Sequence, residues 1–586
     1  MKKLLALIMS VLTVLTSVAI TGCGDVGMVD QEPIDTSKTQ LNVAISDDGI
    51  GRGWYNWLKT EYQKKNPDVQ VVLQNRDAQL SKKEAAVMEL DDDIACMGFN
   101  DYEMYGSYLM DVTDALTSKA YDANYNYVGM GKGTVSAVDR LDADEAGIFN
   151  IGTKEQPKYK VMPWYTSIYG IWYDVDMWEE NDLDEYSGYY GLDGKKGTDD
   201  DLFGPDGEEG TYDDGKPATF EDFKRLLAYM SSSTSGLISK KPFTWSQKEN
   251  WMQTYVLDYI VATYEQKNDY CLHYTFDGTH SIAGEITPKT GYKLYTEQTR
   301  QGYKAALYFS ELIDSKEYYS AGSVKSGSTH LEAQNEYLNS VVNESDGLRS
   351  MFLFDGSWWQ YEAKDYFDKM ADRVNKKYAF GTRKFAFFPF PKFIGTEGIT
   401  DQSASDKNIC PVTNSNVFVP LQKAVQNNKA DIVKDFILFA MSNEALTAFV
   451  EINNIPTTLD FKWDKNNNTF NHMTISQLEY MEDKNTEILY MRGEADYSAN
   501  ECFREQQSSA LGDWDWAATI EGGKYEMSPI NEMCMKKGDA ITAEMYWKGM
   551  FDFAIGADRV WNEESKAYTG SGKFAMNKWA STFKLN

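Results

Sequence analysis

The sequence has few basic residues and few histidines, and each shortage excludes a class of function. Its 586 residues contain 58 Lys and Arg against 89 Asp and Glu, a formal net charge of −31. Phosphate backbones are bound by clustered Lys and Arg, so this balance argues against nucleic acid as a partner. Four histidines occur without an HExxH pattern, which argues against a hydrolytic zinc centre.

Paired cysteines and long apolar runs are also missing from most of the chain. Six cysteines are present, and the five after residue 23 are widely spaced without a CxxC pair, which predicts neither a disulfide scaffold nor a zinc site. Beyond residue 23 no stretch reaches the roughly 18 to 20 apolar residues of a spanning helix. Aromatic residues are abundant instead, with 15 Trp and 38 Tyr. This surplus is typical of binding surfaces and indicates a ligand with apolar faces and polar edges.

The N-terminus determines the predicted compartment. Residues 1–22 read as a secretory signal peptide, with two lysines before the apolar run from Leu4 to Ile20. The sequence ITGC that ends at Cys23 resembles the lipobox of bacterial lipoproteins, which implies cleavage before Cys23 and a diacylglycerol on its sulfur. The alternative is a buried apolar helix followed by an unrelated cysteine. Residues 23–39 are polar and predict a linker, so we expect a chain tethered to the membrane by lipid rather than embedded in it.

The fold begins with an alternation of strand and helix patterns. Residues 41–45 alternate as a short strand, and a Gly-rich turn leads into an amphipathic helix over 54–62. The helix ends at Asn66-Pro67, and 69–73 supplies a second strand. Such units build parallel sheets with helices on both faces, so the sequence predicts an α/β fold.

Six blocks, taken in order, resemble extracellular solute-binding proteins of family 1, the maltose-binding-protein-like group. No single block is specific, but the order covers about residues 40–460. The blocks are LNVAISDDGIGRGWYNWLKTEYQKKNPDVQVVL, DDDIACMGFNDYEMYGSYLMDVTDAL, KYKVMPWYTSIYGIWYDVDMWEENDL, PATFEDFKRLLAYM, MFLFDGSWWQYEA and FVPLQKAVQNNKADIVKDFILFAMSNEALTAFVEINNIPT.

This resemblance implies a two-lobe periplasmic-binding-protein-like fold (type II) with a hinge between the lobes. The expected limits are 40–162 plus 393–454 for lobe one, and 163–392 plus 455–586 for lobe two. It also implies a monomeric, lipid-anchored protein on the extracellular face of the cytoplasmic membrane. There it would bind an oligosaccharide or other sugar between the lobes and serve the permease subunits of an ABC importer, with no catalysis and no required cofactor.

Aromatic and carboxylate side chains at turns are the predicted ligand contacts, because sugar C–H faces pack on rings and hydroxyls donate to carboxylates. Acids after predicted strands stand where ligands meet open α/β sheets. A role in the core, or for the first acids in helix capping, is the alternative in each case. The candidates are Asp47, Asp48, Asn100, Asp101, Trp164, Tyr165, Trp245, Trp358, Trp359, Trp514, Trp516 and Trp547.

An acidic repeat interrupts the second predicted lobe. Residues 191–201 (GLDGKKGTDDD) and 204–214 (GPDGEEGTYDD) match at seven of eleven positions with an offset of thirteen. Calcium takes about six to eight oxygen ligands, which makes the repeat a candidate Ca²⁺ site, although neither the EF-hand nor the Gly-Gly-x-Gly-x-Asp pattern is met. A solvated loop is the alternative. The candidate ligands are Asp193, Asp200, Asp201, Asp206, Asp213 and Asp214.

Two further functions are compatible with these patterns. A secreted carbohydrate-active enzyme would need two carboxylates flanking the scissile bond, and 89 acidic residues leave that pairing open. A surface lipoprotein that docks glycans without a transporter is the other, and the acidic repeat is its main support.

Overall fold

The structure is a computed structural model of the whole chain. It describes residues 33–490 apart from gaps, and shorter segments beyond residue 490. The gaps are 47–48, 99–104, 154, 189–196, 199–200, 233–238, 276–277, 288–289, 295, 326, 343–348, 414–415 and 467–468, and the later segments are 518–520, 523–525, 529–535, 541–554, 560–562, 564 and 567–569.

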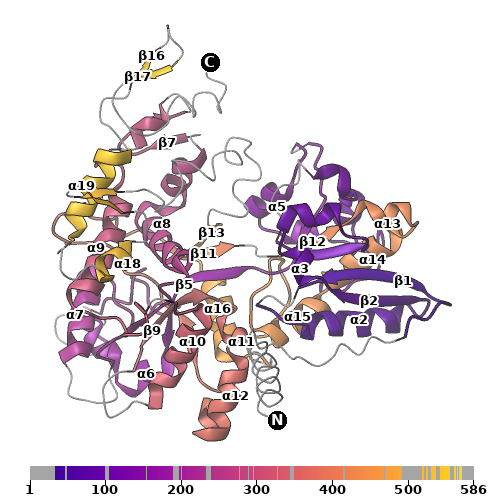
Figure 1. Cartoon of the computed structure of the whole chain (residues 1–586), viewed down its shortest axis with the longest axis horizontal. Helices are drawn as coiled ribbons and strands as arrows, with labels where there is room; N and C mark the ends of the chain where they lie inside the picture. Colours follow the sequence, from indigo (N-terminus) through magenta and orange to yellow (C-terminus); the bar gives the residue numbers. More distant parts are fainter. Residues whose placement is uncertain are drawn as a thin grey trace, which may run out of the picture.

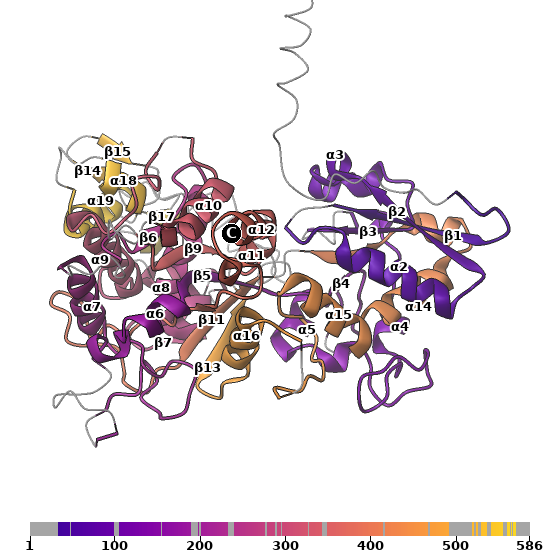
Figure 2. The ribbon, with the colours of Figure 1, turned by 90° about the horizontal axis from the view of Figure 1, so that it is seen from below.

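Two bodies, each built around its own sheet, lie side by side in both views of the molecule (Figures 1 and 2). In the described residues, the sheet of lobe one has five strands. Strands β1 and β2 pair in parallel, as the sequence predicts, while β12 runs antiparallel to both of its neighbours. The strand order is β2 (Val69–Asn75), β1 (Thr39–Ile45), β3 (Ile94–Met97), β12 (Val417–Pro420) and β4 (Met162–Pro163).

Helices cover the sheet of lobe one, and α2 (Gly53–Lys65) illustrates how they do so. Its buried residues include Trp54, Leu58 and Tyr62, which recur every four residues on one face. The indole N–H of Trp54 donates to the Ala445 carbonyl at 2.8 Å, which ties α2 to α15. The helices of this lobe also include α3 (Asp77–Leu80), α4 (Thr113–Thr117), α5 (Ala143–Phe149), α13 (Gln422–Gln426), α14 (Ala430–Ala440) and α15 (Asn443–Asn453).

The sheet of lobe two is mixed and largely buried. Strand β5 is buried along its whole length and pairs antiparallel with β9, β10 and β11. Such a strand requires cover on both faces, which explains its continuous apolar and aromatic sequence. The path through the sheet is β13 (Thr486–Tyr490), β11 (Asn408–Thr413), β5 (Ser167–Asp174), β9 (Phe352–Gly356) and β6 (Phe243–Thr244), with β10 (Phe385–Phe387) beside β5.

Helices and small hairpins surround this second sheet. The longest helix, α8 (Asn250–Thr275), is interrupted at Gln266, where the backbone is not helical. The hairpins are β7/β8 (Gly278–His280, Gly284–Ile286), β14/β15 (Ala518–Ile520, Gly523–Tyr525) and β16/β17 (Val560–Asn562, Ala567–Thr569). The other helices are α6 (Val175–Glu180), α7 (Phe220–Ser232), α9 (Gln301–Ser315), α10 (His330–Asn339), α11 (Trp359–Glu362), α12 (Lys364–Arg373), α16 (His472–Glu482), α18 (Pro529–Met535) and α19 (Ala543–Ala554).

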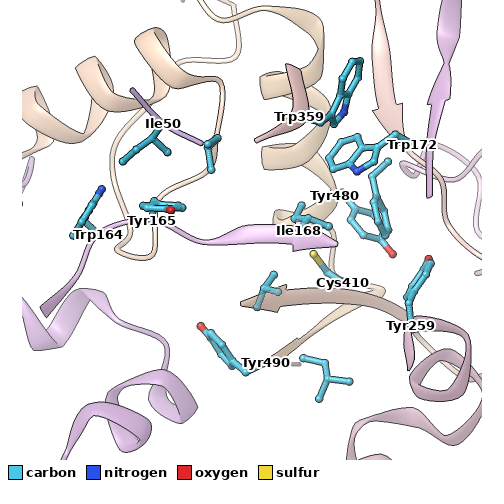
Figure 3. Close-up of a cluster of buried hydrophobic side chains, with 14 of the residues drawn as sticks. Ile50, Trp164, Tyr165, Ile168, Trp172, Tyr259, Trp359, Cys410, Tyr480 and Tyr490 are labelled. Carbon is cyan, nitrogen blue, oxygen red and sulfur yellow. The ribbon is translucent and has the colours of Figure 1, made fainter. Parts of the chain in front are cut away.

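The chain passes between the two sheets after β4, after β11 and after α15. The first and third crossings pair with each other: Thr166 N–H donates to the Pro456 carbonyl at 3.2 Å, and Thr458 N–H donates to the Trp164 carbonyl at 3.3 Å. Figure 3 shows Trp164 and Tyr165 on the chain that continues into β5. These paired segments, 164–166 and 456–458, form the hinge ribbon.

The expected limits of the two lobes stay predictions, but the pairing of one strand within them can be compared with the structure. Residues 393–454 were expected in lobe one, but β11 at 408–413 pairs with β5 and β13 in the sheet of lobe two. The chain therefore returns to lobe one only at β12. No helix in the described part of the chain has the length and apolar character needed to cross a membrane.

Candidate functional site

Trp358 lies in the turn between β9 and α11, and its ring folds over Gly356. A methyl group on Gly356 would lie 2.3 Å from the Trp358 ring, so this Gly-x-Trp spacing needs glycine at its first position. The Trp358 ring is half-buried and meets Tyr169 edge to face, with 4.8 Å between centroids. Tyr169 in turn stacks on Tyr255 at 4.2 Å. An aromatic surface thus forms at the carboxyl end of β9.

A loop of lobe one lies directly against this surface. Gly49 and Gly51 follow β1 and have left-handed backbones, with φ of +61° and +58°. A methyl group on Gly49 would lie 3.6 Å from Glu362 Oε1 and 3.8 Å from Trp358 Cβ. One on Gly51 would lie 2.7 Å from the Tyr361 hydroxyl. The absence of side chains at these two glycines therefore lets the lobes approach each other at α11.

A network of carboxylates lies behind this contact. The amide nitrogen of Gln334 donates to Asp355 Oδ2 at 2.9 Å and to Glu362 Oε2 at 2.8 Å. His330, one turn earlier on α10, lies 4.0 Å from Glu362 Oε2 and 3.8 Å from Glu249 Oε1. Burial raises the pKa of Asp355 well above its usual range, and the charge of Glu362 adds to the rise.

Several of the predicted aromatic contacts are buried in the cores. Trp164 stacks on Trp54 at 5.7 Å, and Trp245 stacks on Phe354 at 5.4 Å, each with no exposed surface. Such large rings at turns pack as readily inward as outward, and inward packing removes more apolar surface from water. The buried members of the predicted set are Trp164, Tyr165, Trp245, Trp359 and Trp547.

The remaining predicted ligand contacts lie outside the described residues. They are Asp47, Asp48, Asn100, Asp101, Trp514 and Trp516, and their roles stay predictions. The described residues that the sequence analysis missed are Glu249, His330, Gln334, Tyr361 and Glu362. One signal was available: Glu362 stands four residues after Trp358, and α-helical spacing puts such a pair on one face.

The second copy of the acidic repeat packs on the edge of the lobe two sheet. Asp213 is fully buried, and its Oδ2 accepts hydrogen bonds from the Asp206 backbone N–H at 2.8 Å and the Asn408 side chain at 2.9 Å. Asn485, just before β13, donates to Asp206 Oδ2 at 2.9 Å. Burial, followed by the nearby charge of Asp206, raises the pKa of Asp213 to about 6.

Both copies of the repeat make the same turn. Gly197 N–H donates to Asp201 Oδ2 at 2.6 Å, and thirteen residues later Gly210 N–H donates to Asp214 Oδ2 at 2.9 Å. Asp193, Asp200 and the lipidation candidate Cys23 lie outside the described residues. Within the described part of the chain, no three His, Cys, Asp or Glu side chains are grouped to hold a metal ion. Calcium binding at the repeat stays a prediction.

Two α/β lobes that are joined by a hinge and meet at an aromatic and acidic contact define the class of the protein. It has a two-lobe, periplasmic-binding-protein-like fold, as the sequence predicts. No protein-family model matches the sequence, and no curated protein matches it.

Solved structures with a similar arrangement include three binding proteins. One is the mannobiose-bound binding protein of an ABC transporter from Bifidobacterium animalis subsp. lactis, at 11% identity over 94% of this chain and 95% of the other, with a TM-score of 0.47. Another is the maltotriose-bound protein of Thermus thermophilus, at 11% over 87% and 98%, with a TM-score of 0.45. The third is apo RafE of Streptococcus pneumoniae, at 11% identity over 86% of this chain and 99% of the other, with a TM-score of 0.46. These likenesses concern overall arrangement and assign neither a ligand nor site residues.

Proposed function

We propose that this protein is a lipid-anchored extracellular solute-binding protein of an ABC importer, and that it holds an oligosaccharide or other sugar between its lobes. No chemical step belongs to this function. The anchor would be Cys23, and the partners would be the permease subunits of the importer.

The pairing of Trp358 with Glu362 carries the proposal. The two residues are one helical turn apart, joined by the hydrogen bond from Glu362 N–H to the Trp358 carbonyl at 3.1 Å. Both lie within 3.8 Å of the position of a methyl group on Gly49 of the opposite lobe. A sugar offers the complementary chemistry, because its C–H face packs on an aromatic ring while its hydroxyls donate to a carboxylate.

The hinge explains how such a site would signal occupancy. A ligand that contacts α11 and the loop after β1 interacts with both lobes only when they are close together. It therefore binds the closed arrangement more tightly and shifts the population toward it. A permease that recognises this arrangement would then distinguish loaded from empty protein.

Isothermal titration calorimetry of residues 24–586 with neutral mono- and oligosaccharides, amino acids and peptides tests the proposal. We expect one class of sugar to bind, with no product detected by chromatography of the mixture. Trp358→Ala should weaken that binding by about 10- to 100-fold, the loss expected from removing a contacting aromatic ring. Trp57→Ala is the matched control, because Trp57 is a half-buried ring of lobe one that stacks on Phe439.

Two results would contradict the proposal. Binding of peptides or amino acids with no response to any sugar would overturn the ligand class. Release of shortened glycans by the purified protein would identify an enzyme instead.

A further inference from the structure

Glu362 is held by one buried amide. Gln334 has no exposed surface, and its single amide nitrogen donates to both Asp355 and Glu362. An amide nitrogen carries two hydrogens, so these two bonds use its full donor capacity. The bond to Asp355, which is 3% exposed at the end of β9, anchors the Gln334 side chain in the core of lobe two. Glu362 Oε2 therefore has a fixed position.

The other oxygen of the Glu362 carboxylate is directed toward lobe one. Glu362 Oε1 lies 3.6 Å from the position that a methyl group on Gly49 would occupy. The backbone at Gly49 therefore packs against the Glu362 carboxylate, and the absence of a side chain at Gly49 lets the two lobes meet there. The Glu362 carboxylate is thus placed where the two lobes meet, one turn from the Trp358 ring.

The carboxyl groups of this cluster differ in burial. Asp355 forms no ion pair among the described residues, and a buried carboxyl without a cation is most stable in its neutral form. Glu362 has 17% of its side chain exposed and Glu249 has 23%, so both are more exposed than Asp355 is. His330 lies 4.0 Å or less from an oxygen of each of these two carboxylates.

We propose, on the basis of the sugar-binding function above, that Glu362 selects ligands by charge and that Gln334, anchored on Asp355, positions it. The site takes sugars that present hydroxyl or ammonium donors to Glu362. It rejects sugars that carry a carboxylate at the same place, since two anions at hydrogen-bond distance repel each other.

The test uses two series of trisaccharides, one α-1,4-linked and one β-1,4-linked. Each series contains the neutral glucose trimer, the 2-amino trimer and the trimer of the 6-carboxylate. Calorimetry on the wild-type chain should give tighter binding of the neutral or the amino member than of the carboxylate in the series that fits the site. A charge-assisted hydrogen bond predicts at least about a 10-fold preference.

Three variants separate selection from general effects. Glu362→Gln should weaken binding of the preferred sugar by about 10- to 100-fold and reduce the ratio of its affinity to that of the carboxylate trimer. Gln334→Met should weaken binding of the preferred sugar. The carboxylate trimer should still bind poorly, because the charge of Glu362 remains. Asp368→Asn removes an equal charge from an exposed position on α12 and should match the wild type.

The outcomes distinguish the two levels of the proposal. If neither these trimers nor any sugar of the wider panel above binds, the sugar-binding function fails and the inference fails with it. If the carboxylate trimer binds as tightly as the neutral one, or if Glu362→Gln and Asp368→Asn change the ratio equally, sugar binding stands but the role of Glu362 is overturned. Urea unfolding of each variant checks that the fold is kept.

Discussion

Replacing Asp213 with asparagine is expected to increase the stability of the protein relative to the wild type as the pH rises from about 4 to above 6. The pKa of Asp213 rises from 3.8 to about 6 in the fold, so the folded state binds more protons than the unfolded state between these values. Its stabilising contribution is complete below about pH 4 and is lost as the pH rises through 6. A shift of about two pKa units corresponds to about 3 kcal/mol. Asparagine stays neutral and does not incur this loss.

Urea unfolding at about pH 4, 6 and 7.5, in the presence of EDTA, measures the effect. The unfolding free energy of Asp213→Asn minus that of the wild type should increase across this range by up to about 3 kcal/mol. An asparagine oxygen can still accept the bonds from Asn408 and the Asp206 N–H, so the fold should persist. A difference that stays flat with pH would refute the assignment of a raised pKa to the burial of this carboxyl.

Calcium provides the second arm of the same experiment. If the acidic repeat binds Ca²⁺, adding the ion should raise the unfolding free energy of the wild type at pH 7.5, and EDTA should reverse this. Asp213→Asn would then lose that increment. No response to calcium in either protein would leave the repeat as a hydrogen-bonded cover for β11 and β13 and would contradict the predicted metal site.

Three further substitutions test the contact, the core and the anchor. Gly51→Ala should weaken ligand binding about 10-fold, because its methyl group would lie 2.7 Å from the Tyr361 hydroxyl and its φ of +58° would be strained. Calorimetry measures the loss, and Tyr361→Ala should restore part of the binding because it removes the contact but not the strain. Arg383→Met should lower the unfolding free energy by about 3 to 5 kcal/mol, because Asp174 loses its buried partner; urea unfolding checks this, and an unchanged midpoint would contradict it. Cys23→Ser should release the protein from the membrane fraction into the medium, as detected by immunoblot, whereas retention would contradict lipidation at Cys23.

The sequence predicts the start of the fold well because its signals there are local. The strand at 41–45, the helix at 54–62 and the strand at 69–73 each follow from side-chain periodicity, and β1, α2 and β2 occupy these positions. The lobe to which β11 belongs depends instead on long-range strand pairing. That choice is made by pairing with β5, which lies more than two hundred residues earlier in the sequence, and with β13, which lies more than seventy residues later.

The adjacent residues Trp358 and Trp359 illustrate why the site was harder to predict. Their side chains point in different directions from the start of α11, so Trp359 packs against Phe385 in the core while Trp358 stays half-buried beside Tyr169. The residue type does not reveal which of the two is exposed, because both are tryptophans in the same turn. Glu362 was accessible in principle through helical spacing, but only once a helix was expected directly after Gly356.

The hydrogen-bonded pair of crossings restricts how the lobes can move. Because the segments at 164–166 and 456–458 are bonded to each other, they cannot slide or twist independently, and the ribbon bends most easily across its thin direction. Opening and closing of the lobes are then close to a single bending motion of the hinge ribbon. An empty molecule has few relative orientations to search, so a ligand that bridges the gap loses little conformational entropy in bringing the lobes together.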